Sequence, residues 1–295
     1  VITFVTIQLI MKYILLLFLT VFLFSCNITT ENAKTIYFGG HIVNPKSNNI
    51  LLLKNNIVID TIELDNKNNF IKNYNNLKEG LYTFKHGIEF QYIYLQPTDS
   101  ILIRLNTWDF DESLVFNGRG SSKNEFLINL FLQNEKEEKE MYKYFNLDEN
   151  NFQAKIDSLT NERVQIFNDF KLNEPNLTSG FENLTNIAIH FPLYRLKEIY
   201  PLYHNRSLKS KNHPNLSSNF YKFRKKISLN EKQLVSFYPY QNYIVSHFYN
   251  LNYNLQKQDS TKNNSTENLL NIISENIKIE DFKNTLLKKI IVNDF

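Results

Sequence analysis

The densest cluster of groups that could do acid–base chemistry is a set of three carboxylates, Asp109, Asp111 and Glu112. Neighbouring carboxylates can act as a general acid and base, or they can bind calcium through their oxygens. Here they alternate with Trp108 and Phe110 near the start of a predicted strand, and no glycine-containing calcium loop surrounds them. We therefore interpret them as a polar turn, with a hydrolase that uses Asp109 and Glu112 as the alternative.

Four histidines lie in the second half of the chain, namely His190, His204, His213 and His247. A zinc site usually takes histidines at positions i and i+4 of a helix, or a carboxylate-assisted pair on one face. None of these pairs has that spacing, so we expect ordinary loop or core histidines. The glycine motifs of nucleotide-binding loops and the Gly-x-Ser-x-Gly motif of hydrolases are also missing from the sequence. We therefore assign no catalytic residue, no metal site and no cofactor.

Tyrosines are dense in one predicted helix and could form a face on which a ligand stacks: Tyr238, Tyr240, Tyr243, Tyr249 and Tyr253. Aromatic side chains at helical spacing are more often part of a core. The core interpretation is favoured here, and the ligand-binding face is the alternative.

Basic residues are scattered, and the formal net charge is only +3. The densest basic run extends from Lys222 to Lys226 and is more typical of a solvated helix face than of a phosphate-binding patch. We therefore expect no nucleic-acid partner.

The only cysteine, Cys26, follows a short and almost entirely apolar segment from Ile14 to Phe24. Met11 and the positively charged Lys12 precede that segment. A run of this length is typical of a signal peptide, because a membrane-spanning helix needs about 20 apolar residues. The sequence Leu23-Phe24-Ser25-Cys26 resembles the lipobox of bacterial lipoproteins. The resemblance implies cleavage before Cys26 and lipidation of its sulfur.

Residues 1–26 are thus interpreted as a signal segment with a lipobox, with Met11 as the expected true start. The alternative is one uncleaved membrane helix from Val1 to Phe24, in which Lys12 would cost about 2.5–3.5 kcal/mol. We expect a protein anchored by lipid to a membrane of the cell envelope, facing the periplasm or the cell surface. With Cys26 lipidated, the mature chain has no thiol for a disulfide, a Cys-x-x-Cys pair or a thiolate metal site.

Residues 35–120 contain about eight short apolar runs, separated by turn residues at intervals of roughly 8–12 residues, which is typical of an antiparallel β-sandwich. Residues 121–295 instead show helical periodicity. Ser122 with Glu125, and Ser228 with Glu231, have the pattern of capping boxes that open helices. We therefore predict an α+β protein, with an N-terminal antiparallel β-sandwich followed by an all-helical region.

Several details of the helical region can be predicted from single residues. Asp148 is an expected N-cap. The helix that begins there should end at Pro175. Pro239 should kink the helix opened by Ser228. Polar stretches predict a loop over Leu202–Ser218 and a linker over Lys257–Thr266. The chain stops at Phe295 while an apolar face is still running, so we expect this helical domain to be incomplete at its C-terminus; that face comprises Leu286, Leu287, Ile290 and Ile291.

Five stretches resemble the N-terminal portion of a family of bacterial lipoproteins whose full-length members end in a thioredoxin-like domain of the TlpA type. They are Tyr37–Asn44, Ile59–Leu64, Glu79–Phe84, Tyr92–Leu105 and Trp108–Gly120. The resemblance implies that the redox Cys-x-x-Cys lies beyond Phe295. It also implies a thiol–disulfide oxidoreductase as the longer gene product.

For the chain as given we expect no enzymatic activity. The first hypothesis is a lipid-anchored, non-catalytic N-terminal module of a TlpA-type oxidoreductase of the Gram-negative cell envelope. The alternative is a surface lipoprotein that binds a glycan or another ligand and has no redox role. The expected partners are the membrane, through the lipid anchor, and an unidentified protein or small-molecule ligand.

Overall fold

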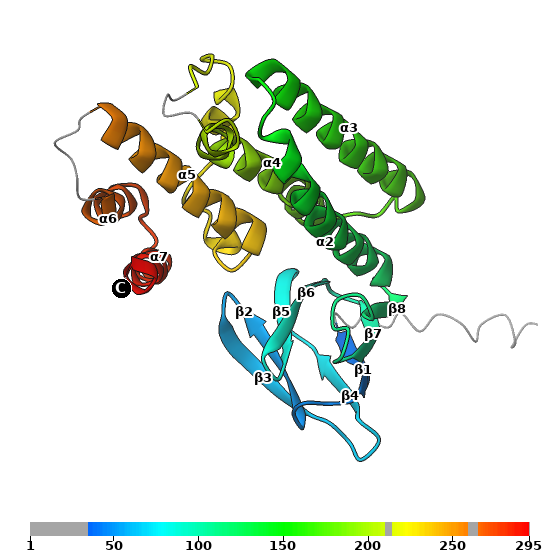
Figure 1. The fold of residues 1–295 in the computed structure, drawn as a ribbon. Coiled ribbons are helices and arrows are strands. Elements are labelled where there is room, and N and C mark those ends of the chain that lie inside the picture. Colours follow the sequence, from blue (N-terminus) through cyan, green and yellow to red (C-terminus); the bar gives the residue numbers. More distant parts are fainter. Residues whose placement is uncertain (1–34, 210–213, 259–264, 295) are drawn as a thin grey trace, which may run out of the picture.

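The computed structural model describes residues 35–209, 214–258 and 265–294, with two four-stranded sheets packed below a layer of helices (Figure 1). The change from strands to helices falls at Gly120, and the α+β class is as predicted. The strands are β1 (Ile36–Val43), β2 (Asn49–Lys54), β3 (Ile57–Glu63), β4 (Asn69–Tyr74), β5 (Gly80–His86), β6 (Glu89–Leu95), β7 (Ser100–Asn106) and β8 (Val115–Arg119). The helices are α2 (Ser121–Met141), α3 (Glu149–Asn173), α4 (Ser179–Ser207), α5 (Tyr238–Gln258), α6 (Ser265–Asn276) and α7 (Glu280–Asp294), with 3₁₀ helices η1 (Tyr142–Tyr144), η2 (Lys222–Lys226) and η3 (Lys232–Leu234).

The strands form one sheet of order β4-β1-β7-β8 and another of order β3-β2-β5-β6. The pairings are antiparallel except for β1 with β7, which is parallel, so the prediction of an antiparallel sandwich needs this correction. The turn at Gln96–Asp99 carries the chain from the end of β6 to the start of β7, which lies beside the start of β1: there Tyr37 N–H donates to the Asp99 carbonyl at 2.9 Å. From there β7 runs in the same direction as β1.

Alternating side chains of the strands point inward and form the core between the two sheets. Phe38 and Phe84 are fully buried there and pack at 5.9 Å between ring centroids. Phe70 meets Phe38 edge to face at 5.2 Å. This alternation is why the strands could be recognised in the sequence.

Helix α2 closes the free edge of β6 through one amide side chain. Asn124 is buried, accepts a hydrogen bond from Tyr94 N–H at 2.6 Å and donates to the Tyr94 carbonyl at 2.9 Å. The Asn124 amide thus takes the place of a neighbouring strand. Beside it, Lys123 and Asp99 form a buried ion pair at 3.3 Å that ties the helix to the sandwich.

The two predicted capping boxes do not form. Helix α2 begins after Gly120, whose φ of 92° suits glycine, and no side chain caps it; Glu125 instead accepts from Phe116 N–H at 3.4 Å. After Ser228 the chain forms only the short helix η3, and α5 begins ten residues later at Tyr238. Pro239 therefore lies in the first turn of α5, where a missing N–H is tolerated, rather than at a kink.

Helix α3 has the predicted ends. Asp148 accepts a hydrogen bond from Asn151 N–H at 3.0 Å as its N-cap, and the helix ends at Asn173 before Glu174 and Pro175.

Helix α4 runs through both Pro192 and Pro201 to Ser207. Pro192 has no N–H for the Ala188 carbonyl, and the Asn134 side chain donates to that carbonyl at 3.4 Å. Arg163 donates to the next carbonyl, that of Ile189, at 3.2 Å. Neighbouring helices thus satisfy the carbonyls beside Pro192. The helix ends at Ser207, so the first six residues of the predicted loop over Leu202–Ser218 are helical instead.

The C-terminal helices α6 and α7 pack against α5 around a core shared with α4. Leu286 and Ile290 are buried in that core and Leu287 packs against it, while Ile291 is 45% exposed. Most of the predicted apolar face is therefore covered by the helices beside it. No helix in the described part of the chain has the length and apolar character that a membrane crossing requires.

Candidate functional site

The structure keeps the three predicted carboxylates in the loop between β7 and β8. Asp111 accepts a hydrogen bond from Gln91 at 2.9 Å, and burial raises the pKa of its carboxyl group. The Asp109 carbonyl accepts from Ser113 N–H at 2.9 Å as part of a turn. These contacts are those of a structured polar turn.

The described histidines are separated from one another and each has its own partner. His190 contacts the Asn186 carbonyl at 2.7 Å and His204 the Phe145 carbonyl at 2.8 Å, while His247 contacts Glu198 at 3.0 Å. His213 lies outside the described residues, as does Cys26. Within the described residues no three side chains of metal-binding type gather at one point.

The five tyrosines do not share one face. Tyr240 and Tyr243 are fully buried in the helical core, as the core interpretation predicts, whereas Tyr238 and Tyr249 are exposed. The Tyr253 hydroxyl accepts from Asn205 at 3.2 Å.

A buried charge network lies between α4, η2 and α5. The Glu198 side chain is fully buried and accepts hydrogen bonds from Arg224 at 2.9 Å and from Tyr243 at 3.3 Å, with His247 at 3.0 Å. Burial alone would raise the pKa of Glu198, but the hydrogen bonds from His247 and Arg224 outweigh it and lower that pKa. The basic run Lys222–Lys226 is therefore not simply a solvated face, because its Arg224 belongs to this network.

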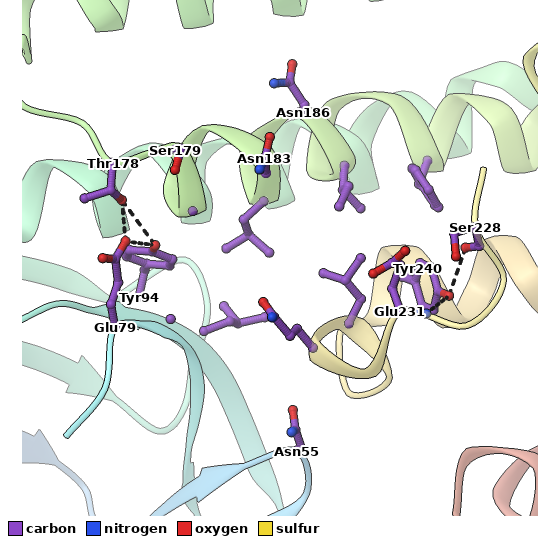
Figure 2. A pocket seen from close by; sticks show the side chains of 18 of the residues that line it. Asn55, Glu79, Tyr94, Thr178, Ser179, Asn183, Asn186, Ser228, Glu231 and Tyr240 are labelled. Carbon is purple, nitrogen blue, oxygen red and sulfur yellow. Dashed lines mark hydrogen bonds between the residues drawn. The ribbon is translucent and has the colours of Figure 1, made fainter. Parts of the chain in front are cut away.

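A cleft of about 930 Å³ opens where the sandwich meets the helices (Figure 2). One wall comes from the β2–β3 turn and the start of β5, the second from the first turns of α4, and the third from the segment before α5. Amide and hydroxyl side chains line it, together with an apolar floor. The amides and hydroxyls are Asn55, Thr178, Ser179, Asn183, Asn186, Ser228 and Gln233, and the floor includes Leu81, Leu184, Ile187, Ile227 and Leu234.

Glu79, Tyr94 and Thr178 form a hydrogen-bonded group that joins the first two walls. The hydroxyls of Tyr94 and Thr178 both donate to the Glu79 carboxylate (Figure 2). Burial, followed by the bond to Glu79, raises the pKa of Tyr94 well above its ordinary value. Because Thr178 is also the N-cap of α4, Glu79 occupies the positive end of that helix. The group therefore fixes the width of the cleft.

Tyr240 fixes the third wall. Its hydroxyl donates to the Ser228 carbonyl at 3.0 Å and accepts from Glu231 N–H at 3.0 Å (Figure 2). Burial raises the pKa of Tyr240 to about 12, so the phenol stays neutral. The segment from Ser228 to Glu231 is thereby held as a defined surface although it is not helical.

Lys54 is the one lining cation that is partly buried, since Lys78 and Lys226 are exposed. Its amine donates to the Leu81 carbonyl at 2.8 Å and lies 4.0 Å from the centre of the Tyr82 ring. Burial lowers the pKa of this amine to about 8.

Sequence reasoning missed the cleft because its residues come from five separate stretches, around residues 54, 79, 94, 183 and 230. No short motif marks them, and only Glu79, Gly80, Leu81 and Tyr94 fall within stretches that carry the family resemblance. The frequency of Asn in the chain is the only available signal, and it is too diffuse to locate a site.

No family model, curated protein or solved structure shows a significant match to the chain.

Proposed function

We propose that the chain is a non-catalytic, glycan-binding module of a lipid-anchored protein of the cell envelope. The observation that carries the proposal is the cleft of about 930 Å³ with its walls rich in amides and hydroxyls and its apolar floor. Its volume is near the top of the range of roughly 300–1,000 Å³ in which ligand sites usually fall.

The chemistry of the walls suits a sugar chain. Sugars present many hydroxyl groups beside apolar ring faces, and the cleft offers amides and hydroxyls beside aliphatic side chains. Asn183 and Asn186 are exposed on α4 with side-chain groups that can both donate and accept. The two glutamates of the lining, Glu79 and Glu231, come from opposite walls, and Glu79 is already bound by two hydroxyls. The site therefore supports binding better than acid–base catalysis.

The anchoring part of the proposal rests on the lipobox-like Leu23–Cys26. The link to a TlpA-type oxidoreductase stays a prediction from the resemblance of the β-rich stretches. A lipid anchor would hold the cleft at a membrane surface, where glycans of the envelope or of the surroundings are concentrated.

Binding of the purified protein to an array of neutral and acidic oligosaccharides tests the proposal. The variant Asn183→Trp places a large ring in the cleft and removes no hydrogen bond of the fold. The matched control is Asn161→Trp, at an exposed position of α3 outside the cleft.

We expect the protein to bind a subset of the oligosaccharides, and Asn183→Trp to lower that binding at least about tenfold while Asn161→Trp leaves it unchanged. Binding that is absent from the whole array, or that both variants leave intact, would contradict the proposal.

A further inference from the structure

Lys54 is unusual among the charged groups of the cleft because its amine is partly buried without a carboxylate partner. Its partners among the described residues are the Leu81 carbonyl at 2.8 Å and the Tyr82 ring at 4.0 Å. The backbone of Gly80 passes so close that a Cβ there would lie 2.6 Å from the amine nitrogen. The amine is therefore held in place at one end of the cleft.

An ammonium group has three N–H donors, and the Leu81 carbonyl accepts only one of them. Partial removal from water makes the charge costly unless an anion approaches it. Burial is the cause that lowers the pKa of Lys54 to about 8, and no nearby carboxylate of the described residues opposes it. The missing partner of this amine is thus a negative group.

The other charges of the cleft fit the same conclusion. Lys54, Lys78 and Lys226 line it against Glu79 and Glu231, and the Glu79 carboxylate is engaged by Tyr94 and Thr178. A single amine beside Asn55 suits one carboxylate, whereas phosphate sites commonly use arginine forks or several backbone donors.

We propose that Lys54 is the anion anchor of the cleft and that the bound glycan carries a carboxylate, as a uronic acid does. This inference rests on the proposed glycan-binding function. Lys54 forms an ion pair with the sugar carboxylate, while the amides of α4 bind its hydroxyl groups.

The test compares trigalacturonic acid with its methyl ester, which has the same sugar chain without the negative charges. We expect the protein to bind the acid roughly ten- to a hundredfold more tightly than the ester, because hydrogen bonds to charged groups are worth about 1.5–3 kcal/mol. Lys54→Met should reduce that ratio to about one, and Lys54→Arg should keep most of it. Lys78→Met is the matched control for an exposed lysine of the same cleft and should leave the ratio unchanged.

A second measurement uses the unmodified sequence and so does not depend on the folding of a variant. Lysines are acetylated with a limiting reagent, and each site is quantified by mass spectrometry. The acid should protect Lys54 and the ester should not. Equal protection by both sugars, protection by neither, or a preference that survives in Lys54→Met would overturn the inference.

The two proposals fail in different ways. If Asn183→Trp abolishes array binding while acid and ester bind alike, the glycan-binding function stands and the role of Lys54 is wrong. If the array shows no binding at all, the function itself is wrong.

Discussion

Lys197 offers the sharpest test of how this fold tolerates buried charge. It lies on α4 with 5% of its surface exposed, and its amine lies between two rings, 4.7 Å from Phe220 and 4.6 Å from Phe223. Burial is the largest influence on the amine and lowers its pKa from 10.5 to about 8, although Asp157 and Glu198 favour the charged form through space. The perturbation we consider is Lys197→Met, which keeps an unbranched side chain and removes the charge.

The magnitude follows from two opposing contributions. A pKa lowered from 10.5 to about 8 corresponds to about 3 kcal/mol against the charged amine in the folded state. The two ring contacts return roughly 1–2 kcal/mol through cation–π attraction. The charge is therefore a net cost, and Lys197→Met should raise the free energy of unfolding by about 1–2 kcal/mol at pH 7. For a chain of this size that gain corresponds to a rise in Tm of about 2–4 °C.

The gain in the free energy of unfolding from Lys197→Met should decrease as the pH rises. Below pH 8 the Lys197 amine is protonated in both the folded and the unfolded state, so the folded protein bears the full cost of burying the charge. Between pH 8 and 10.5 the unfolded state binds more protons than the folded state, so the free energy of unfolding of the unchanged protein rises with pH. The advantage of Lys197→Met should therefore shrink across this window and vanish near its middle, at about pH 9.

Urea unfolding followed by circular dichroism at pH 7, 8, 9 and 10 measures these differences. The matched control is Lys288→Met on α7, an exposed lysine whose removal should change stability by less than about 0.5 kcal/mol. A Lys197→Met protein that is less stable at pH 7 would show that the ring contacts outweigh desolvation. A gain that stays constant with pH would show that it does not come from the amine.

Three further predictions concern the core, the anchor and redox activity. Glu198→Gln should lower the free energy of unfolding by about 1.5–3 kcal/mol in urea titrations, because it leaves the partly buried Arg224 without its anion; a loss below about 1 kcal/mol would contradict the network. Cells fed a labelled fatty acid should label the protein in the membrane fraction, and Cys26→Ala should lose both label and membrane attachment; retention of either contradicts lipidation. The purified chain from Asn27 to Phe295 should not accelerate insulin reduction by dithiothreitol, because thiol exchange needs an attacking thiolate and this part of the sequence contains no cysteine; turnover above the uncatalysed rate would refute this.

The sequence alone determined the features that depend on neighbouring residues. Strand alternation identified the β-rich region, since every second side chain must face the core. Asp148 and Pro175 marked the ends of α3 because each acts on the backbone groups beside it. The class of the fold followed from these local periodicities.

The tertiary structure decided whatever depends on partners distant in the chain. The Ser122–Glu125 pattern was overridden because Glu125 binds Phe116 instead, and α4 continues through Pro192 because Asn134 binds the carbonyl that the proline leaves free. The parallel pairing of β1 with β7 likewise depends on where the chain returns to the sheet.

The candidate site likewise depends on residues that are distant from one another in the chain. Lys54 and Asn183 are unremarkable in the sequence, and their interest arises from a cleft that several distant segments enclose. The cost of a charge is set by how much water the surrounding fold removes and by which partners it supplies. Both the water removed and the partners supplied depend on residues from the whole tertiary structure, so they cannot be predicted from a local pattern of residues.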